Sequence, residues 1–567
     1  MSLVSRRDVL HAGAATAAIA AAGSLGPLTR VAAQQRLTEA DLLRFEPLGN
    51  VTLLHIADLD GQLVPVHLRE PSVDPGLRER RELPRHLPDA EALGRFGAST
   101  GSALAHALTA DDFAALAHSY GRIGGLDRAA RVVKAVRDER GDERVLLFDG
   151  GDTWQGSLGA YRTRGQDMVE CLKLLRPDAM TGHWEFTHGE QRVKELIGAL
   201  GCPFLALNVR DTEWDEPIFE AYRTYEKGGV KVAVLGQAFP FTAISNPRWL
   251  VPTWSFGIRE EDIRATVEKV RREGAELVVL LSHNGLGIDR KLAARIPGMD
   301  VILTAHNHDP WPEVIKVGQT LLVASGSHGK FVARLDLDVH NGKVRDHRFK
   351  LIPLFADAIR PDPEVNAAIA RARAPFAAEL ARVVGHSEAL LYRRGIFAAS
   401  FDDVICAALL EQRDAEVGFS PGFWWGTTVL PGSPITIEDI HNVTAISYPQ
   451  VCRRAMTGAQ LKELLEGAAD NVFNPDPYYQ QGGDMIRGGG LGYTIDPAKS
   501  AGQRISEMYL LRTGEPIEAS KEYVVAGWAC TSEGVDGPPI WDIVEQHIAH
   551  KKIVRAEPAC RVKVIET

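Results

Sequence analysis

Several common sequence features are missing from this 567-residue chain. Its six cysteines form no C-x-x-C pair, so their spacing indicates neither a zinc ribbon nor one particular disulfide pattern. Beyond the N-terminal region there is no uninterrupted apolar run of the roughly 20 residues that a membrane-spanning helix needs. Acidic residues outnumber basic ones, 74 to 64, which does not favour a nucleic-acid-binding surface. These absences predict a globular protein without a membrane span, and the length indicates two domains.

The N-terminus has the composition of an export signal. A twin-arginine stretch at residues 5–10 precedes an alanine-rich, weakly apolar run at residues 12–25 and a small-residue cleavage candidate at residues 31–33. This pattern predicts a removable Tat-type signal over residues 1–33 and a periplasmic location for the mature protein. An ordinary basic N-terminal arm is the alternative interpretation.

Residues 51–339 alternate short β-branched runs with amphipathic helices. For example, Ile263, Val267 and Val270 recur at helical spacing, and Gly274 ends that predicted helix. The alternation predicts α/β layering, in which functional side chains gather where strands end. The predicted strands cover residues 51–56, 144–148, 204–208, 230–236, 277–282, 301–304, 320–325 and 332–339.

Breaks in this pattern predict the domain order. Residues 65–120 interrupt the alternation with proline-, arginine- and alanine-rich sequence, which is typical of a surface insertion. A Pro-Asp-Pro segment at residues 361–363 opens a predicted helix over residues 364–384, which is suited to connect two domains. We therefore expect a first domain at residues 34–355, a helical linker at residues 356–385 and a second domain at residues 386–567.

Side chains that commonly bind metals follow the ends of predicted strands in five segments. They are Asp58 and Asp60 in HIADLDG, Asp152 in GGDTWQGS, His183 in TGHWEFT, His283 in LSHNG, and His306 and His308 in TAHNH. Each segment alone is readily explained as an acidic turn or a buried histidine. Together they form the ligand set of a two-metal hydrolase, with Asp152 placed between glycine and threonine where it can bridge two cations. Asp and His ligands leave manganese, zinc and iron open.

The order of these motifs resembles the 5′-nucleotidase branch of the calcineurin-like metallophosphoesterases. The resemblance covers nearly the whole mature chain and includes three segments of the second domain, at residues 434–436, 456–458 and 490–493. It implies a layered α/β metallophosphoesterase sandwich followed by an α+β C-terminal substrate-binding domain. It also implies one metal held by Asp58, Asp60, Asp152 and His308, and a second held by Asp152, His183, His283 and His306.

The chain departs from the nucleotidase pattern at positions that handle the substrate. Trp184 and Thr187 stand where a nucleotidase has its transition-state histidine and the aspartate partner of that histidine. The segment at residues 420–425 lacks the arginine of a phosphate-binding loop, and Met485 replaces a phenylalanine of the base clamp. Nucleotide is therefore disfavoured as the substrate.

The altered pattern resembles the thiosulfohydrolase family of the bacterial Sox thiosulfate-oxidation system. The resemblance implies a periplasmic enzyme with two manganese ions, which cleaves the terminal sulfonate of a cysteine S-thiosulfonate on the carrier protein SoxYZ and releases sulfate. A metal-bound hydroxide would attack the sulfonate sulfur. The leaving sulfur anion is stable near neutral pH, so a proton donor at position 184 is dispensable. The candidate catalytic residues are Asp152, His183 and Trp184.

The substrate-binding residues are predicted from composition around the second domain. Gly488, Gly489 and Gly490 could form a narrow slot for an extended carrier arm, with Trp424 of the aromatic cluster at residues 423–425 as its wall. Arg487 and Asn208 are further candidates for substrate contacts. A glycine-rich turn, an ordinary interdomain core, a surface arginine and a capping asparagine are the alternative interpretations.

Two other functions compete with this interpretation. A periplasmic 5′-nucleotidase or cyclic phosphodiesterase would use the same metals. A metal-stabilised binding subunit would dock a sulfur carrier without catalysis, although every expected metal ligand is present in the sequence.

Overall fold

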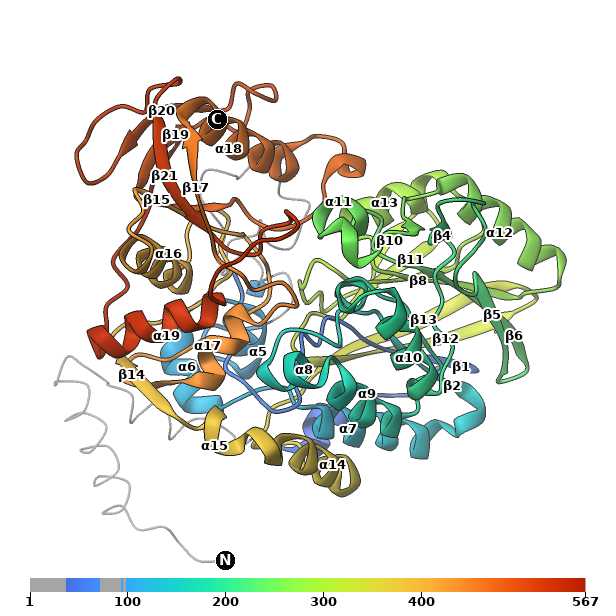
Figure 1. Cartoon of the computed structure of the whole chain (residues 1–567). Coiled ribbons are helices and arrows are strands. Elements are labelled where there is room, and N and C mark those ends of the chain that lie inside the picture. Colours follow the sequence, from blue (N-terminus) through green and yellow to red (C-terminus); the bar gives the residue numbers. More distant parts are fainter. Residues whose placement is uncertain (1–36, 72–92, 95–97, 566–567) are drawn as a thin grey trace, which may run out of the picture.

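The computed structural model describes residues 37–71, 93–94 and 98–565, which form two domains (Figure 1). The predicted export signal, residues 1–33, lies outside the described residues. Among the residues that are described, no helix combines the length and the apolar character needed to cross a membrane.

The first domain contains two mixed β-sheets that share one hydrophobic core. In the five-stranded sheet the order is β13-β12-β1-β2-β3, and in the six-stranded sheet it is β10-β11-β9-β8-β6-β5. The first sheet comprises β1 Val51–Ile56, β2 Val145–Asp149, β3 Ala179–Met180, β12 Phe331–His340 and β13 Lys343–Pro353. The second comprises β5 Tyr222–Lys227, β6 Val230–Gln237, β8 Leu277–Ser282, β9 Val301–Thr304, β10 Ile315–Val317 and β11 Thr320–Ala324.

Helices cover the outer faces of this sandwich. In Figure 1, α12 and α13 lie on one side of the strands and α7, α9 and α14 lie on the other. Their bounds are α7 Leu126–Arg140, α9 Gln166–Leu172, α12 Glu260–Arg272, α13 Leu286–Arg295 and α14 Pro363–Arg373. Further helices are α3 Glu39–Leu43, α5 Ala103–Leu108, α6 Phe113–Tyr120, α8 Leu158–Thr163, α10 Glu190–Leu200 and α11 Thr242–Ser245. The α/β layering predicted from the sequence is confirmed.

One predicted strand, over residues 204–208, is not a regular strand. Its backbone amides donate to three different segments: Leu205 to Met180, Ala206 to Glu220, and Leu207 to Gly236. Because Met180 belongs to one sheet and Gly236 to the other, the segment crosses between the two sheets and cannot continue in either. The prediction also missed β5 and β13, whose polar, partly exposed side chains hide the strand pattern.

The linker is more broken than the sequence predicted. The single helix expected over residues 364–384 is α14, then a 3₁₀ turn at Ala374–Phe376, then α15 Ala377–Leu380. Pro375 within that turn has no amide hydrogen to continue the α-helical bonding. The chain then enters β14 Val383–Ser387, which pairs with strands of the second domain.

The second domain is α+β, as predicted. Its three sheets consist of β14, β16 Pro434–Thr436 and β22 Ile553–Val554; β15 Val417–Ser420, β17 Cys452–Thr457, β18 Arg487–Gly489 and β21 Glu522–Gly527; and β19 Leu491–Ile495, β20 Ile505–Leu510 and β23 Arg561–Val564. Its helices are α16 Ser400–Gln412, α17 Ile437–Thr444, α18 Gly458–Phe473 and α19 Ile540–Lys551. A disulfide joins Cys452 in β17 to Cys530, just after β21.

A buried ion-pair network joins the two domains. Arg394 of the second domain contacts Glu70 at 3.2 Å and Asp309 at 2.8 Å. On the other side of Glu70, the Lys330 Nζ lies 2.6 Å from its carboxylate. Arg394 also donates to the backbone carbonyls of Asn307 and of His308, the residue after it. The network therefore ties the second domain to the segment at the start of the insertion and to a loop with a predicted metal ligand.

The network predicts a large effect for Glu70→Ala. The variant leaves two buried cations without their shared carboxylate, so we expect the free energy of unfolding to fall by about 3–5 kcal/mol. Glu46→Ala is the matched control, because the Glu46 carboxylate pairs with Arg348 at 3.0 Å while 90% exposed and should contribute little. Urea unfolding of both variants compares the two losses. An equal decrease in the free energy of unfolding in both variants would contradict a large contribution of the buried network to stability.

Candidate metal centre

The seven predicted metal ligands lie together, in loops that follow five strands of the sandwich. Asp58 and Asp60 follow β1, Asp152 follows β2, His183 follows β3, His283 follows β8, and His306 and His308 follow β9. All seven are buried. The parallel pairing of β1 with β2 and of β8 with β9 brings their carboxyl ends to one edge, so that segments distant in sequence converge.

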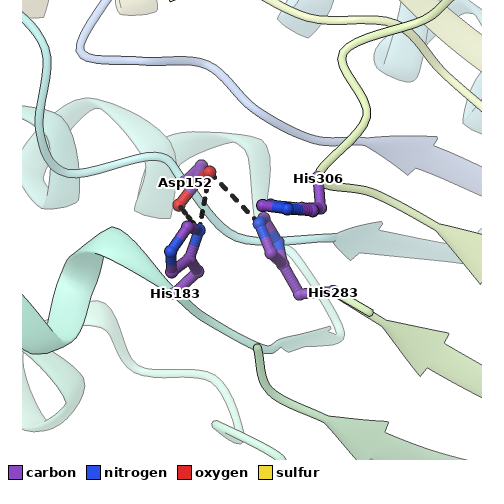
Figure 2. A group of neighbouring side chains, drawn as sticks. All are labelled: Asp152, His183, His283 and His306. Atoms are coloured by element: carbon purple, nitrogen blue, oxygen red, sulfur yellow. Dashed lines mark hydrogen bonds and ion pairs between the residues drawn. The ribbon is translucent and has the colours of Figure 1, made fainter. Parts of the chain in front are cut away.

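The ligand atoms form overlapping groups. One group consists of Asp152, His183, His283 and His306, whose ligand atoms all lie within 4.8 Å of one another (Figure 2). A second consists of Asp58, Asp152 and His308. Asp152 belongs to both, as expected for a carboxylate that bridges two cations.

Asp60 belongs to a third group, which contains a residue that the sequence analysis missed. This group joins Asp60 and His308 to His328. The His328 Nδ1 lies 3.4 Å from a carboxylate oxygen of Asp60, and its Nε2 accepts the amide hydrogen of Gly426 at 3.0 Å. His328 follows β11 just as the predicted ligands follow their strands, and that spacing was the available sequence signal.

The Asp152 carboxylate lies against two imidazole nitrogens and accepts one backbone hydrogen bond. The His183 Nδ1 lies 3.2 Å and the His283 Nε2 lies 3.1 Å from one of its oxygens, and the Trp184 amide donates to the other oxygen at 2.8 Å. Burial alone would raise the pKa of Asp152, but the two imidazoles hold it well below its ordinary value. Glu185, also missed from the sequence, accepts amide hydrogens from Thr153 and His183 and so fixes the turn.

Backbone carbonyls determine which nitrogen of two histidines can bind a cation. A carbonyl can only accept, so the His283 Nδ1 donates its hydrogen to Gly150 at 2.6 Å and leaves Nε2 facing Asp152. By the same reasoning the His306 Nε2 donates to the Gln481 carbonyl at 3.0 Å. The His306 Nδ1 is then the acceptor nitrogen, and it is buried with no hydrogen-bond partner among the described residues.

The buried carboxylates of the site repel one another and favour protonation of their neighbours, a repulsion that bound cations would relieve. Burial, followed by repulsion from Asp152 and Asp58, raises the pKa of Asp60 well above its ordinary value. Burial would lower the pKa of His283, but Asp152 raises it to about 10. One Asp60 oxygen is also buried without a hydrogen-bond partner among the described residues. Carboxylate oxygens and imidazole nitrogens in this arrangement can hold two divalent metal ions.

A cavity of about 210 Å³ opens beside the ligands and is walled by both domains. No lysine or arginine occurs among the described residues that line it. The first domain contributes Trp184, Phe239 and Ser245 besides the ligands, and the second contributes Phe423, Trp424, Trp425, Asn471, Gln481, Gly482 and Gly483. Trp424, predicted as a wall of the substrate slot, is among these lining residues, and its Nε1 donates to Asp484 at 3.1 Å.

The glycines of the predicted slot do not line the cavity. Gly488 and Gly489 lie in β18 and pair with β15, and a Cβ added at Gly489 would meet the Cys406 Cβ at 2.6 Å. Gly490 packs against the carbonyl of Glu416. These glycines serve close packing inside the second domain, whereas Gly482 and Gly483 are the glycines that line the cavity.

Arg487 and Asn208, the other predicted substrate contacts, bond within their own domains. Arg487 is buried and bonds to Asp402, Asp484 and backbone carbonyls of its own domain. The Asn208 side chain bonds to the backbone of Ala238 and Gly257 and connects three loops of the first domain. Neither residue lines the cavity.

Comparisons with known proteins place this architecture in a family. The model of the 5′-nucleotidase C-terminal domain matches residues 383–545. A sulfate thiohydrolase SoxB from Thermus thermophilus, solved with glycerol, is 35% identical with a TM-score of 0.88, over 92% of this chain and 98% of that one. A 5′-nucleotidase precursor, also from Thermus thermophilus, shares the fold, with 20% identity and a TM-score of 0.72 over 91% and 99% of the two chains. The 5′-nucleotidase of Bos taurus is 22% identical over 76% of this chain and 81% of its own.

The shared carboxylate predicts the metal content. We expect two divalent ions per chain, and Asp152→Asn should lose both ions or nearly all activity, because a neutral amide cannot bridge two cations. Elemental analysis after native export measures the ions. Asp127→Asn, at a buried carboxylate outside the ligand groups, is the control and should keep both. Full activity with only one metal ion per chain, or full activity of Asp152→Asn, would contradict the assignment of Asp152 as the carboxylate that bridges two metal ions.

Proposed function

Because the chain belongs to the 5′-nucleotidase family of metallophosphoesterases, and to its SoxB branch, we propose that it is a thiosulfohydrolase. Its substrate is a cysteine S-thiosulfonate on the carrier protein SoxYZ, and its product is sulfate. A water oxygen bonds to the terminal sulfonate sulfur while the bond between that sulfur and the middle sulfur of the thiosulfonate breaks. The electron pair of the broken bond stays on the middle sulfur, which remains bonded to the cysteine sulfur. The carrier therefore keeps a persulfide, and the two protons of the water pass to solvent.

Two divalent cations, when bound, supply an activated water and positive charge for the sulfonate oxygens. Manganese is the proposed metal, as the resemblance implied. The protein fixes the site around them through Asp152, which accepts a hydrogen bond from the Trp184 amide and lies beside the imidazole rings of His183 and His283. Residues 1–33 support a periplasmic location, where the carrier would be met.

The observation that carries the proposal is the position of Trp184. Its ring packs edge-on against Phe423 and Trp425, with centroids 5.3 Å away in each case, and it lines the cavity beside Asp152. An indole is not a proton donor for a leaving alkoxide. An alkoxide leaving group needs such a donor, whereas a persulfide anion leaves without one. The wall that Trp184 forms therefore favours a sulfur leaving group over a phosphate ester.

The charge of the cavity supports the same choice. The lining contains aromatic rings, amides and one hydroxyl beside the metal ligands, and the described lining residues include no lysine or arginine. A phosphomonoester carries up to two negative charges, and a bidentate arginine is the usual partner for such a group. A sulfonate carries one charge and loses less when that partner is missing. The aromatic wall from Phe423 to Trp425 also suits an extended, uncharged carrier segment.

The proposal predicts which product appears. The Mn²⁺-loaded protein should release sulfate from carrier-bound thiosulfonate and negligible phosphate from AMP or simple phosphomonoesters. Ion chromatography and a phosphate assay on the same preparation measure both products. Efficient AMP hydrolysis would overturn the proposal in favour of a nucleotidase. Release of neither product by the metal-loaded protein would favour a binding subunit.

A second prediction separates the tryptophan from the missing arginine. Trp184→His should not create AMP hydrolysis, because the cavity would still lack a cationic partner for the phosphate. Trp184→Phe is the matched apolar control. It should release sulfate at a rate within about tenfold of wild type, because position 184 contributes a backbone amide to Asp152 and an aromatic ring to the cavity wall, and both remain in this variant. Phosphate release by Trp184→His at a rate comparable to a nucleotidase would contradict this role for the cavity charge.

A further inference from the structure

We propose that the second domain is part of the metal centre. Two of its loops, through the Gln481 carbonyl and the Gly426 amide, set the orientation of His306 and His328, so that retention of the metals depends on these contacts. The inference rests on the proposed metal centre and is independent of the sulfur substrate.

The first contact fixes the tautomer of a ligand. The Gln481 carbonyl accepts the Nε2 hydrogen of His306 at 3.0 Å, so Nδ1 carries the lone pair that faces the other ligands. The loop is fixed in turn by Asn471, which accepts from the Gln481 amide at 2.5 Å and donates to the Gly482 carbonyl at 2.6 Å. Ser245 of the first domain donates to the Gln481 side chain at 2.8 Å. The acceptor carbonyl is therefore held from both domains.

Gly482 permits this close approach. Its φ is +88°, and an added Cβ would collide with the His306 Nε2 and meet the Trp424 ring at 3.1 Å. The next residue, Gly483, has nearly the same backbone, with φ of +84°, but its Cβ would meet only the Gly422 carbonyl, at 3.2 Å. A side chain at either position would therefore meet the same strain of a left-handed backbone, but only a side chain at position 482 would contact His306.

The second contact acts on Asp60 through His328. The amide hydrogen of Gly426 points to the His328 Nε2 at 3.0 Å, which leaves the ring hydrogen on Nδ1. That nitrogen is hydrogen-bonded to the Ser327 hydroxyl at 2.8 Å and lies 3.4 Å from a carboxylate oxygen of Asp60. The His328 amide also donates to the Asp58 carbonyl at 2.6 Å. His328 is therefore a positioning residue that touches two ligand residues and is oriented from the second domain.

Both contacts act on metal ligands from outside, as supporting residues do in other metal sites. Loss of such a support typically lowers metal affinity about 10–100-fold. Because the two loops are separate, near residues 426 and 482, the second domain holds the ligand set at two points. A change in either loop is expected to weaken metal binding even though neither loop supplies a ligand.

A titration of the full-length mature protein with Mn²⁺ tests the first contact. Free Mn²⁺ is followed by electron paramagnetic resonance in metal-free wild type, Gly482→Ala and Gly483→Ala. We expect Gly482→Ala to bind at least one Mn²⁺ about tenfold more weakly, and Gly483→Ala to stay within about threefold of wild type. Equal losses in both variants, or wild-type affinity in Gly482→Ala, would overturn the Gln481 contact.

The His328 variants test the second contact and do not depend on whether Gly482→Ala folds. His328→Ala should weaken Mn²⁺ binding, and His328→Asn should restore most of it, because the Asn amide can donate from the place of Nδ1 and tolerates the left-handed backbone. Wild-type affinity in His328→Ala would overturn the role of His328. A wild-type protein that binds no Mn²⁺ would overturn the proposed metal centre itself.

Discussion

The arrangement of the site depends on one carboxylate that is shared between two groups of ligands. Asp152 is almost fully buried beside Asp58 and Asp60, where negative charges repel one another strongly because the surroundings are poorly screened. Imidazoles and an amide hydrogen compensate part of this charge, and the two proposed cations would compensate the rest. The sandwich brings the ligand residues together, because β1, β2, β8 and β9 all end at one edge. No single segment of the chain carries enough of these residues to form the site alone.

That convergence requires an unusual backbone. Six residues of the site have positive φ although none is glycine: Asp58, Asp60, Asp152, His306, His308 and His328. Such conformations cost on the order of 1–3 kcal/mol each and persist where the surroundings fix them. Here the Asp58 amide donates to Gly151 and the Asp60 amide donates to Asp152, which joins two of the strained turns directly. Asp and His are also among the residues that tolerate this region best.

The sequence was sufficient for the layered fold and for the seven predicted ligands that the structure brings together, because strand ends and ligand types are local features. The sequence did not identify which residues of the second domain line the cavity, because that depends on packing between segments that are distant in the chain. Two glycine-rich segments look alike in sequence, but residues 488–490 pack against Cys406 and Glu416 while Gly482 faces His306. Arg487 could not be recognised as structural, because its partner Asp402 is distant in the chain. His328 stands alone in its segment and gained meaning only from its contacts with Asp60 and Gly426.

The buried network of Lys330, Glu70, Arg394 and Asp309 limits how this chain can be recombined with its relatives. Three of these residues lie in the first domain and one in the second, so each half alone would expose a charge that the other half neutralises. A chimera that grafts the second domain of a nucleotidase onto this first domain would inherit the mismatch. A chimera that is meant to exchange substrate specificity within the family would therefore need the segment around Glu70 and the second domain to come from the same parent protein.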